Sequence, residues 1–359
     1  MKKKIFLFIC ILLFTTACSD YEELENLAYV TSIGIDYIND EYNVTYEILN
    51  SKKGNNKVVF ESYTVDATDK SISNAFLKAA EEAKLYPYFA HTDLLLIDEN
   101  VAKEKLEEIN DFIIRENEVR EFFYFCVTKN AKETLNTKNE ENPVVANAVK
   151  NQLEINKYSK NEFHSLTFDQ FINNIENFNL DNAIPYVSID NDKVEVDKMV
   201  SFKNYKLVDF LDKNHSYIYN LFKENDAKYY VTQEFSDKII NAGVVFSKKE
   251  IEIKDNKINI NIIAFGEIIN NETDFNMKNS NDLKTISETF ENTIKEDVTK
   301  FIKYLQENNL DFLGFKNKYY IKNRKDLNDE WLNYEINVNV DFKLAKKGII
   351  YDSLQNNKK

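Results

Sequence analysis

A run of strictly alternating residues in the last thirty positions limits the fold more than any other feature of the sequence. Apolar side chains stand at every second position, with Asn, Glu, Asp or Lys between them: Leu332, Tyr334, Ile336, Val338, Val340, Phe342 and Leu344. Alternation of this length predicts a β-strand that has a core on one face and water on the other.

Two further patterns supply partners for this strand. Residues 251–265 alternate on either side of the polar pair Asp255-Asn256, which predicts a β-hairpin. Apolar residues from Leu283 to Leu305 recur at three- or four-residue spacing, which predicts a long helix with one apolar face. The simplest architecture lays this helix across an antiparallel sheet, in a C-terminal domain over 233–355.

The first half of the chain mixes both periodicities. The patterns predict strands at 27–36, 42–48, 57–65, 92–97 and 122–127, and helices at 71–85, 101–116, 144–157 and 167–177. Either Asp98 or Asn100 is expected to cap the helix that begins at Val101. We expect an N-terminal mixed α/β domain over 18–183 and a small middle domain over 184–232. The predicted class is therefore α+β, with three mixed α/β domains.

Composition excludes two common classes of function. The chain of 359 residues carries 46 Lys and Arg against 60 Asp and Glu, a net charge of −14. Nucleic-acid binding is therefore not expected, because a phosphate backbone needs a basic surface. With only six Gly in the whole chain, a Gly-rich phosphate loop is not expected either.

The first eighteen residues resemble the export signal of a bacterial lipoprotein. Three lysines precede an apolar run over 5–14, which is too short for a membrane span of about 20 residues. Ala17, a small residue, stands directly before Cys18, as in the lipobox, where the Cys sulfur takes a diacylglyceryl group and becomes the new N-terminus. We predict a signal peptide over 1–17 and lipid attachment at Cys18. Ordinary cleavage that leaves a free thiol is the alternative.

No catalytic or metal constellation is predicted. The sequence holds no Ser elbow, Cys-His motif or HExxH. Cys126 lies in the apolar segment FFYFCV and is expected to be an inert core thiol. The three histidines are too far apart in sequence for a close ligand pair, and no metal or cofactor is expected: His91, His164 and His215. A turn-stabilising hydrogen bond is expected of His91.

Charged neighbours also have a structural interpretation. Acidic pairs such as Glu81-Glu82 and Glu107-Glu108 are expected on solvated helix faces, because adjacent residues of a helix point in different directions. Arg115 and Arg120 could contact a partner or form interior ion pairs, and the pairing role is favoured.

Several segments together resemble the Ger(x)C family of spore germination lipoproteins, the C subunits of nutrient germinant receptors in endospore-forming bacteria. The similarity covers nearly the full length. In the first half of the chain, the matching segments are Cys18 to Asp36, with the run Ile33-Gly34-Ile35-Asp36, then FAHTDLLLIDENVA at 89–102, and 112–135 with Arg115 and Arg120. In the second half they are DFLGF at 311–315, Trp331 and KKGII at 346–350.

This resemblance implies a location, partners and a role. It implies three domains of mixed α and β structure, no known enzymatic activity, and assembly with two integral membrane subunits, an A-type and a transporter-like B-type. The chain would be held by Cys18 in the bilayer, at the outer face of the inner spore membrane. We expect a non-catalytic, membrane-anchored subunit that is needed for assembly or signalling in germination.

Two other functions remain as alternatives. An extracytoplasmic solute-binding lipoprotein that captures a small nutrient would need a deep cleft with convergent polar groups. A wall-lytic enzyme is the weaker alternative.

Overall fold

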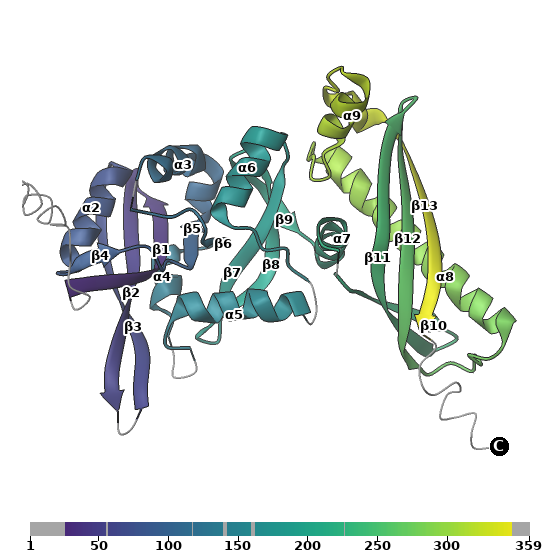
Figure 1. Cartoon of the computed structure of the whole chain (residues 1–359), viewed down its shortest axis with the longest axis horizontal. Coiled ribbons are helices and arrows are strands. Elements are labelled where there is room, and N and C mark those ends of the chain that lie inside the picture. The colour runs from purple at the N-terminus through teal and green to yellow at the C-terminus, as the bar shows by residue number, and fades with distance from the viewer. Residues whose placement is uncertain are drawn as a thin grey trace, which may run out of the picture.

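The computed structural model describes residues 26–54, 57–116, 118–138, 142–158, 162–225 and 227–346. The predicted signal peptide, Cys18 and the KKGII segment from Lys347 onward lie outside this part of the chain. Figure 1 shows two bodies side by side, a larger one built from the first half of the chain and a smaller one in which the long helix α8 lies along a sheet. The helix α7 lies between them. The α+β class is confirmed.

The larger body is built on a sheet of nine strands. Their order is β3-β2-β1-β5-β6-β7-β8-β9, and β4 pairs with the start of β1. The strands are β1 (Leu27–Ile38), β2 (Glu41–Gly54), β3 (Lys57–Asp69), β4 (Tyr86–Tyr88), β5 (Leu94–Asp98), β6 (Tyr124–Thr128), β7 (Asn182–Asp190), β8 (Lys193–Lys203) and β9 (Lys206–Leu211). The central strands β1, β5, β6 and β7 run parallel, and antiparallel strands flank them on both sides.

Helices cover both faces of this sheet, which explains the unbroken apolar run of β5. Leu95 and Ile97 join one buried cluster with residues of α2, α3 and α6, whereas Leu94 and Leu96 join another with residues of α4 and α5. A parallel strand that is buried on both faces needs apolar side chains at every position. The helices are α2 (Ile72–Glu82), α3 (Leu106–Arg115), α4 (Ala131–Asn136), α5 (Val145–Tyr158) and α6 (Phe168–Phe178).

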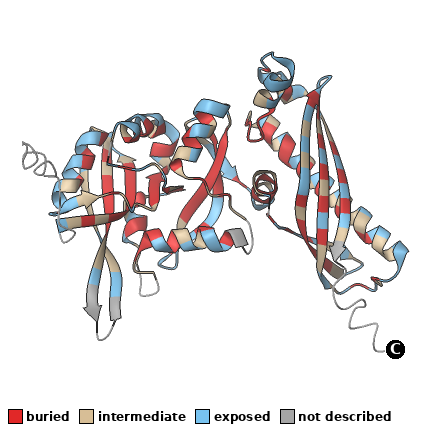
Figure 2. Cartoon of the chain, viewed as in Figure 1, coloured by how far each residue is buried: buried red, intermediate tan, exposed pale blue. Residues whose placement is uncertain are grey.

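The smaller body has a four-stranded sheet, ordered β10-β11-β12-β13, with α8 along one face. The predicted apolar stripe of α8 is confirmed, since from Ile286 to Leu305 its members are fully buried against the sheet. Figure 2 shows this buried side of α8 and the buried central strands of both sheets. The elements are α7 (Lys213–Lys223), β10 (Tyr229–Phe235), β11 (Lys238–Lys254), β12 (Lys257–Asn271), α8 (Ser280–Glu307), α9 (Phe315–Asn323) and β13 (Glu335–Lys346).

The sheet under α8 is not antiparallel throughout. The predicted hairpin is confirmed, because β11 and β12 pair antiparallel around Asp255 and Asn256, which both have positive φ. The last strand, β13, pairs with β12 in parallel, from Lys257↔Glu335 onward. The expectation of a fully antiparallel sheet was wrong at this pair. The chain reaches β13 through α8, and a long helical crossover returns it to the same end of the sheet.

The segment 184–232 does not form a sheet of its own among the described residues. Its strands β7, β8 and β9 continue the large sheet, because β7 pairs in parallel with β6 at Val127↔Tyr186, whereas β10 belongs to the small sheet. The division into three domains and its boundaries stay a prediction. None of the helices within the described ranges is both long enough and apolar enough to cross a membrane.

Candidate functional site

Of the residues singled out in the sequence, His91 and Arg120 line one pocket, described below. Cys18 is outside the described residues. Cys126 is fully buried in β6, and burial raises the pKa of its thiol, so it is a core residue as predicted. In the part of the chain that the structure describes, no three His, Cys, Asp or Glu side chains are grouped so that they could hold a metal ion.

The histidines have separate structural surroundings. The Nδ1 atom of His164 lies 3.0 Å from Oε1 of Glu224, and that of His215 lies 2.9 Å from Oδ2 of Asp212. His91 is exposed, and its ring lies against the rings of Tyr29 and Tyr88.

The turn that contains His91 is held by its neighbours. The Thr92 hydroxyl donates to the carbonyl of Val30 at 3.1 Å, and the Asp93 N–H donates to the carbonyl of Thr31 at 2.9 Å. The hydrogen bonds described for this turn thus come from Thr92 and Asp93 rather than from the His91 ring.

Arg115 forms an ion pair, but at the surface and not in the interior, where its pairing was expected. Its guanidinium donates to both carboxylate oxygens of Asp111, one turn earlier in α3, at 2.9 to 3.1 Å. Both side chains are exposed, so this is a surface pair of small energetic value. The acidic pairs at 81–82 and 107–108 are exposed on their helices, as expected.

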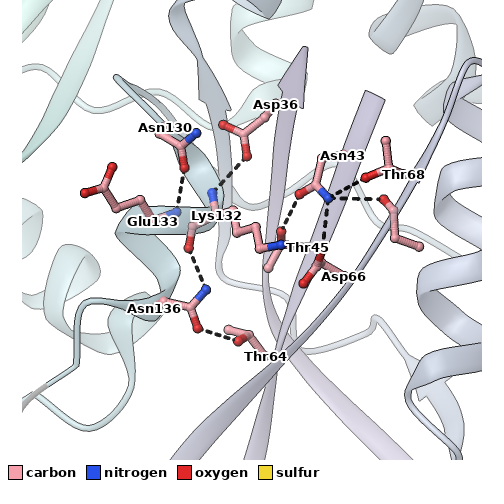
Figure 3. A network of polar contacts seen from close by, with 11 residues as sticks. Asp36, Asn43, Thr45, Thr64, Asp66, Thr68, Asn130, Lys132, Glu133 and Asn136 are labelled. Atoms are coloured by element: carbon pink, nitrogen blue, oxygen red, sulfur yellow. Dashed lines mark hydrogen bonds and ion pairs between the residues drawn. The ribbon is translucent and has the colours of Figure 1, made fainter. Parts of the chain in front are cut away.

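Asp36 ends the run Ile33-Gly34-Ile35-Asp36, one of the segments that carry the family resemblance. Its buried carboxylate accepts the backbone N–H of Ala131, the first residue of α4, at 2.6 Å. It also accepts the backbone N–H of Lys132 at 2.9 Å (Figure 3). A Cβ at Gly34 would lie only 2.8 Å from the side chain of Leu135. The helix α4 can lie this close to β1 because the motif has glycine at this position. The Ile33–Asp36 run therefore seats α4 on the sheet.

Around Asp36, side chains extend this contact to the neighbouring strands. Lys132 Nζ lies 2.6 Å from Oδ2 of Asp66 on β3, and the Asn43 amide on β2 donates to the same oxygen at 3.0 Å. The Thr64 hydroxyl donates to Asn136 at 2.7 Å. Figure 3 shows these residues linking α4 to β2 and β3. The network is structural, because the carboxylates of Asp36 and Asp66 both face donors of the protein itself.

Glu47 performs the same task for α5. Its carboxylate is fully buried and accepts five hydrogen bonds, from the hydroxyls of Thr31, Ser32 and Ser62 and from two N–H groups at the start of α5. The N–H donors belong to Val145 at 2.7 Å and Ala146 at 3.0 Å. A helix N-terminus stabilises a carboxylate, so this residue fastens α5 to β1, β2 and β3.

Of the two residues predicted to cap the helical segment after β5, Asp98 is the one that does so. Its Oδ1 accepts the Val101 N–H at 2.7 Å, whereas the Asn100 amide donates to the carbonyl of Tyr37. The first turn, Val101–Lys105, is a π-helix, and α3 follows it directly. Burial raises the pKa of the Asp98 carboxyl to about 6.

Another family motif, DFLGF, forms the junction between the two bodies. Asp311 accepts the N–H groups of Phe315 at 2.7 Å and Lys316 at 2.9 Å, which starts α9. Its own N–H donates to Oδ2 of Asp181 at 2.7 Å, and Oδ1 of Asp181 accepts the Asn204 N–H at 3.0 Å. Asp181 and Asp311 are both buried, so together they join the start of β7 to the start of α9.

The helix α7 completes this junction. The Tyr217 hydroxyl donates to Glu162 at 2.7 Å, and the Tyr219 hydroxyl accepts the N–H of Ala183 at 3.3 Å. The ring of Tyr219 also packs against Phe312 of the DFLGF motif, with 5.0 Å between ring centroids. The two bodies therefore share buried polar and aromatic contacts rather than a bare linker.

A hollow of about 630 Å³ lies beside this junction, between the end of α6 and α9. Polar and aromatic side chains line it, among them Asn177, Lys316, Tyr320 and Asp329. Of its lining residues only Leu327 is buried. Small-molecule sites enclose most of their ligand, so this open hollow lacks the burial that solute capture requires.

A smaller pocket of about 340 Å³ brings together residues from two segments of the family resemblance. His91 and Asp93 come from the turn before β5, Arg120 and Phe122 from the segment before β6, and Lys150 from α5. Lys150 is paired with Asp93 at 2.9 Å. We call this the amino-edge pocket, because it lies at the amino ends of the parallel strands β5 and β6.

Sequence reasoning missed the roles of three buried carboxylates, those of Asp36, Glu47 and Asp311. Asp36 and Asp311 stand in the motifs that carry the family resemblance, so the motifs marked them, but no role was assigned. Glu47 alternates with apolar neighbours and would have been placed on the polar face of β2. Its burial depends on the start of α5 and on side chains of β1 and β3 that meet it on that face.

The fold and these polar groups define a two-part α+β protein in which buried acids hold helices and a junction in place. Comparison with known families then identifies the chain. Residues 20–189 match the spore germination protein N-terminal domain, and residues 197–348 match the family described as spore germination B3/GerAC like, C-terminal. The chain belongs to this family of spore germination proteins, and the resemblance stated from the sequence is confirmed.

Three curated relatives come from Bacillus subtilis strain 168. The putative spore germination protein YfkR is 23% identical over 99% of this chain and 100% of its own length. Spore germination protein KC is 24% identical over 85% of this chain and 84% of its own. Spore germination protein A3 is 26% identical over 55% of this chain and 54% of its own.

A solved structure supports the fold. The crystal structure of the GerBC protein matches 91% of this chain and 100% of its own, with a TM-score of 0.50 and 17% identity. At this identity the similarity concerns the fold alone. The family membership gives the chain its role in spore germination.

Proposed function

We propose that this chain is the lipid-anchored, non-catalytic subunit of a nutrient germinant receptor. Its body would be tethered through Cys18 at the outer face of the inner spore membrane, beside the integral A-type and transporter-like B-type subunits. The observation that carries the proposal is the family match, which begins at residue 20, two positions after the lipobox-like Ala17-Cys18 pair.

The tether explains how modest protein contacts could suffice for assembly. Two acyl chains give stable membrane attachment, whereas one gives only marginal binding. A tethered body searches a surface rather than a volume, which raises its effective concentration next to the membrane subunits. Leu27 follows Cys18 by nine residues, a length that reaches at most about 30 Å when fully extended.

The polar architecture favours a binding body over a reacting one. Asp36, Glu47 and Asp311 are buried acids of a kind that could serve in catalysis, but each accepts backbone N–H groups. Those hydrogen bonds hold the carboxylates at helix starts, away from solvent. A two-part body joined by buried contacts suits the transmission of contact between neighbouring subunits.

The test is the variant Cys18→Ala, made in the full-length chain of the spore-forming host. We expect the protein to fold but to wash from membranes at alkaline pH, and the germination response to nutrients to be reduced. Mass spectrometry of the processed N-terminus should find the diacylglyceryl group on wild-type protein only.

The matched control is Cys126→Ala, which removes a buried thiol and leaves the lipidation site intact. That variant should stay with the membrane fraction. A Cys18→Ala strain that germinates like wild type, or a wild-type chain whose Cys18 sulfur carries no lipid, would refute the anchoring role.

A further inference from the structure

The amino-edge pocket stands where the tethered chain enters the fold. The strands β1, β5 and β6 run parallel, with Ser32 beside Leu94 and Leu94 beside Tyr124, so their amino ends share one edge of the sheet. The residues before β5 and β6 therefore project from the same edge at which β1 begins. Tyr29 of β1 lies against the His91 ring, which joins the entering chain to the pocket.

Phe122 is exposed at this edge to an unusual degree. Its side chain is 75% exposed, the highest fraction among the large hydrophobic residues of the described ranges, although its neighbour Phe123 is buried. Tyr86, at the start of β4 and beside the first residues of β1, is also exposed. Exposed aromatic side chains with a polar neighbour are typical of surfaces that meet a membrane interface.

Arg120 gives this edge a cation. Lys150 is neutralised by Asp93, but in the described part of the chain Arg120 enters none of the ion pairs or hydrogen bonds. It is exposed and lines the pocket with His91 and Phe122. A guanidinium is well suited to a phosphodiester, because its planar fork can contact two phosphate oxygens together.

We propose that this edge is a lipid-contact site, in which Phe122 enters the headgroup region of the bilayer and Arg120 contacts a lipid phosphate. The inference rests on the proposed anchoring, since Leu27 follows Cys18 by only nine positions, which holds the edge within about 30 Å of the membrane. Loss of the three lysines of the predicted signal peptide takes the net charge from −14 to −17, which repels the rest of the body from anionic headgroups. Contact at this edge would therefore fix how the body stands on the membrane.

Tryptophan fluorescence can test the contact directly. The only native tryptophan, Trp331, is fully buried in the smaller body and supplies a constant background. The reporter is Phe122→Trp in the full lipidated chain, reconstituted in vesicles of phosphatidylcholine and phosphatidylglycerol with brominated acyl chains. The matched control is Ile321→Trp, an exposed position on α9.

We expect a several-fold larger loss of emission for Phe122→Trp than for Ile321→Trp. Adding Arg120→Glu to Phe122→Trp should remove most of that difference. Equal quenching of Phe122→Trp and Ile321→Trp would overturn the lipid-contact site. The same conclusion would follow if adding Arg120→Glu left the quenching of Phe122→Trp unchanged.

The outcomes also separate this inference from the proposed function. A chain that washes from the vesicles at alkaline pH refutes the anchor, and the contact with it. A chain that stays bound but shows no quenching at position 122 refutes the contact alone. A Phe122→Trp signal that responds only when the integral subunits are reconstituted as well would assign this edge to a protein partner and also overturn the lipid contact.

Discussion

Buried carboxylates are the residues that define this fold. Glu47 accepts five hydrogen bonds at the start of α5, and Asp36 and Asp311 each accept two N–H groups at the start of a helix. A buried charge is tolerated only where such donors replace water. These acids therefore hold the contacts that cross from helix to sheet.

Asp98 allows this principle to be tested through pH. Burial raises its pKa from the ordinary 3.8 to about 6, so the ionised form is less favourable in the folded chain than in the unfolded chain. The stability linked to this group is complete below about pH 4 and is lost as the pH rises through about 6. Asp98→Asn removes the titration and can still accept the Val101 N–H.

The free energy of unfolding of Asp98→Asn, relative to wild type, should rise by up to about 3 kcal/mol between pH 4 and pH 7. Urea unfolding of both mature chains across that range measures the difference. A constant difference over the whole range would contradict the raised pKa.

At the scale of single residues, the sequence predicted burial of apolar side chains but not of Glu47. The apolar surroundings of Cys126 predicted its burial correctly. Nothing in the sequence separated Glu47 from the other 59 acids, because its strand looks half-buried and its donors come from positions 31, 32, 62, 145 and 146. Such sites depend on contacts between distant segments, which periodicity does not encode.

At the scale of elements, periodicity performed better. The predicted helix at 283–305 is α8 at 280–307, and the predicted hairpin turn lies at Asp255-Asn256. The last strand begins at Glu335 rather than Leu332, because 329–333 form a short 3₁₀ helix. Its direction was not predictable, since alternation states which face is buried but not which neighbour lies beside the strand.

The contact between β12 and β13 can be tested at Gly266. A Cβ there would overlap the ring of Phe342, whose Cε2 would lie only 2.6 Å away. Gly266→Ala should therefore destabilise the protein by about 1–3 kcal/mol, as overpacking does. Gly243→Ala on β11 is the matched control, because its Cβ would make an ordinary contact of 3.4 Å with Ile269.

Thermal and urea unfolding of both variants give the comparison. Combining Gly266→Ala with Phe342→Leu should cost less than the sum of the single changes, because the smaller side chain leaves room for the methyl group. Equal stability of the two glycine variants would show that β13 does not press on β12 at this point.

At the scale of the whole molecule, the junction determines whether the two bodies act as one. Asp181, at the start of β7, holds N–H groups from both bodies, and the DFLGF motif and α7 pack around it. The sequence marked this motif only by resemblance. A segment near 184–232 was expected to form a separate domain, but its strands are divided between the two sheets.

Asp181→Ala should loosen the junction. It leaves the buried N–H groups of Asn204 and Asp311 without their acceptor, which should cost roughly 2–4 kcal/mol. We expect faster hydrogen exchange at these two amides and a broader or divided thermal transition. Asp326→Ala, at an exposed position, should change stability by less than about 0.5 kcal/mol. A single, unshifted transition for Asp181→Ala would mean that the bodies are coupled elsewhere.

The parallel pairing of β13 with β12 also affects biosynthesis. Until the ribosome has released residues 335–346, the outer edge of β12 has no covering strand, although α8 is already available to cover the apolar face. An open edge of this length can recruit the matching strand of another nascent copy. We therefore expect strand exchange between unfinished chains to be a form of misassembly for this topology. A premature stop before Glu335 would leave the edge of β12 permanently uncovered.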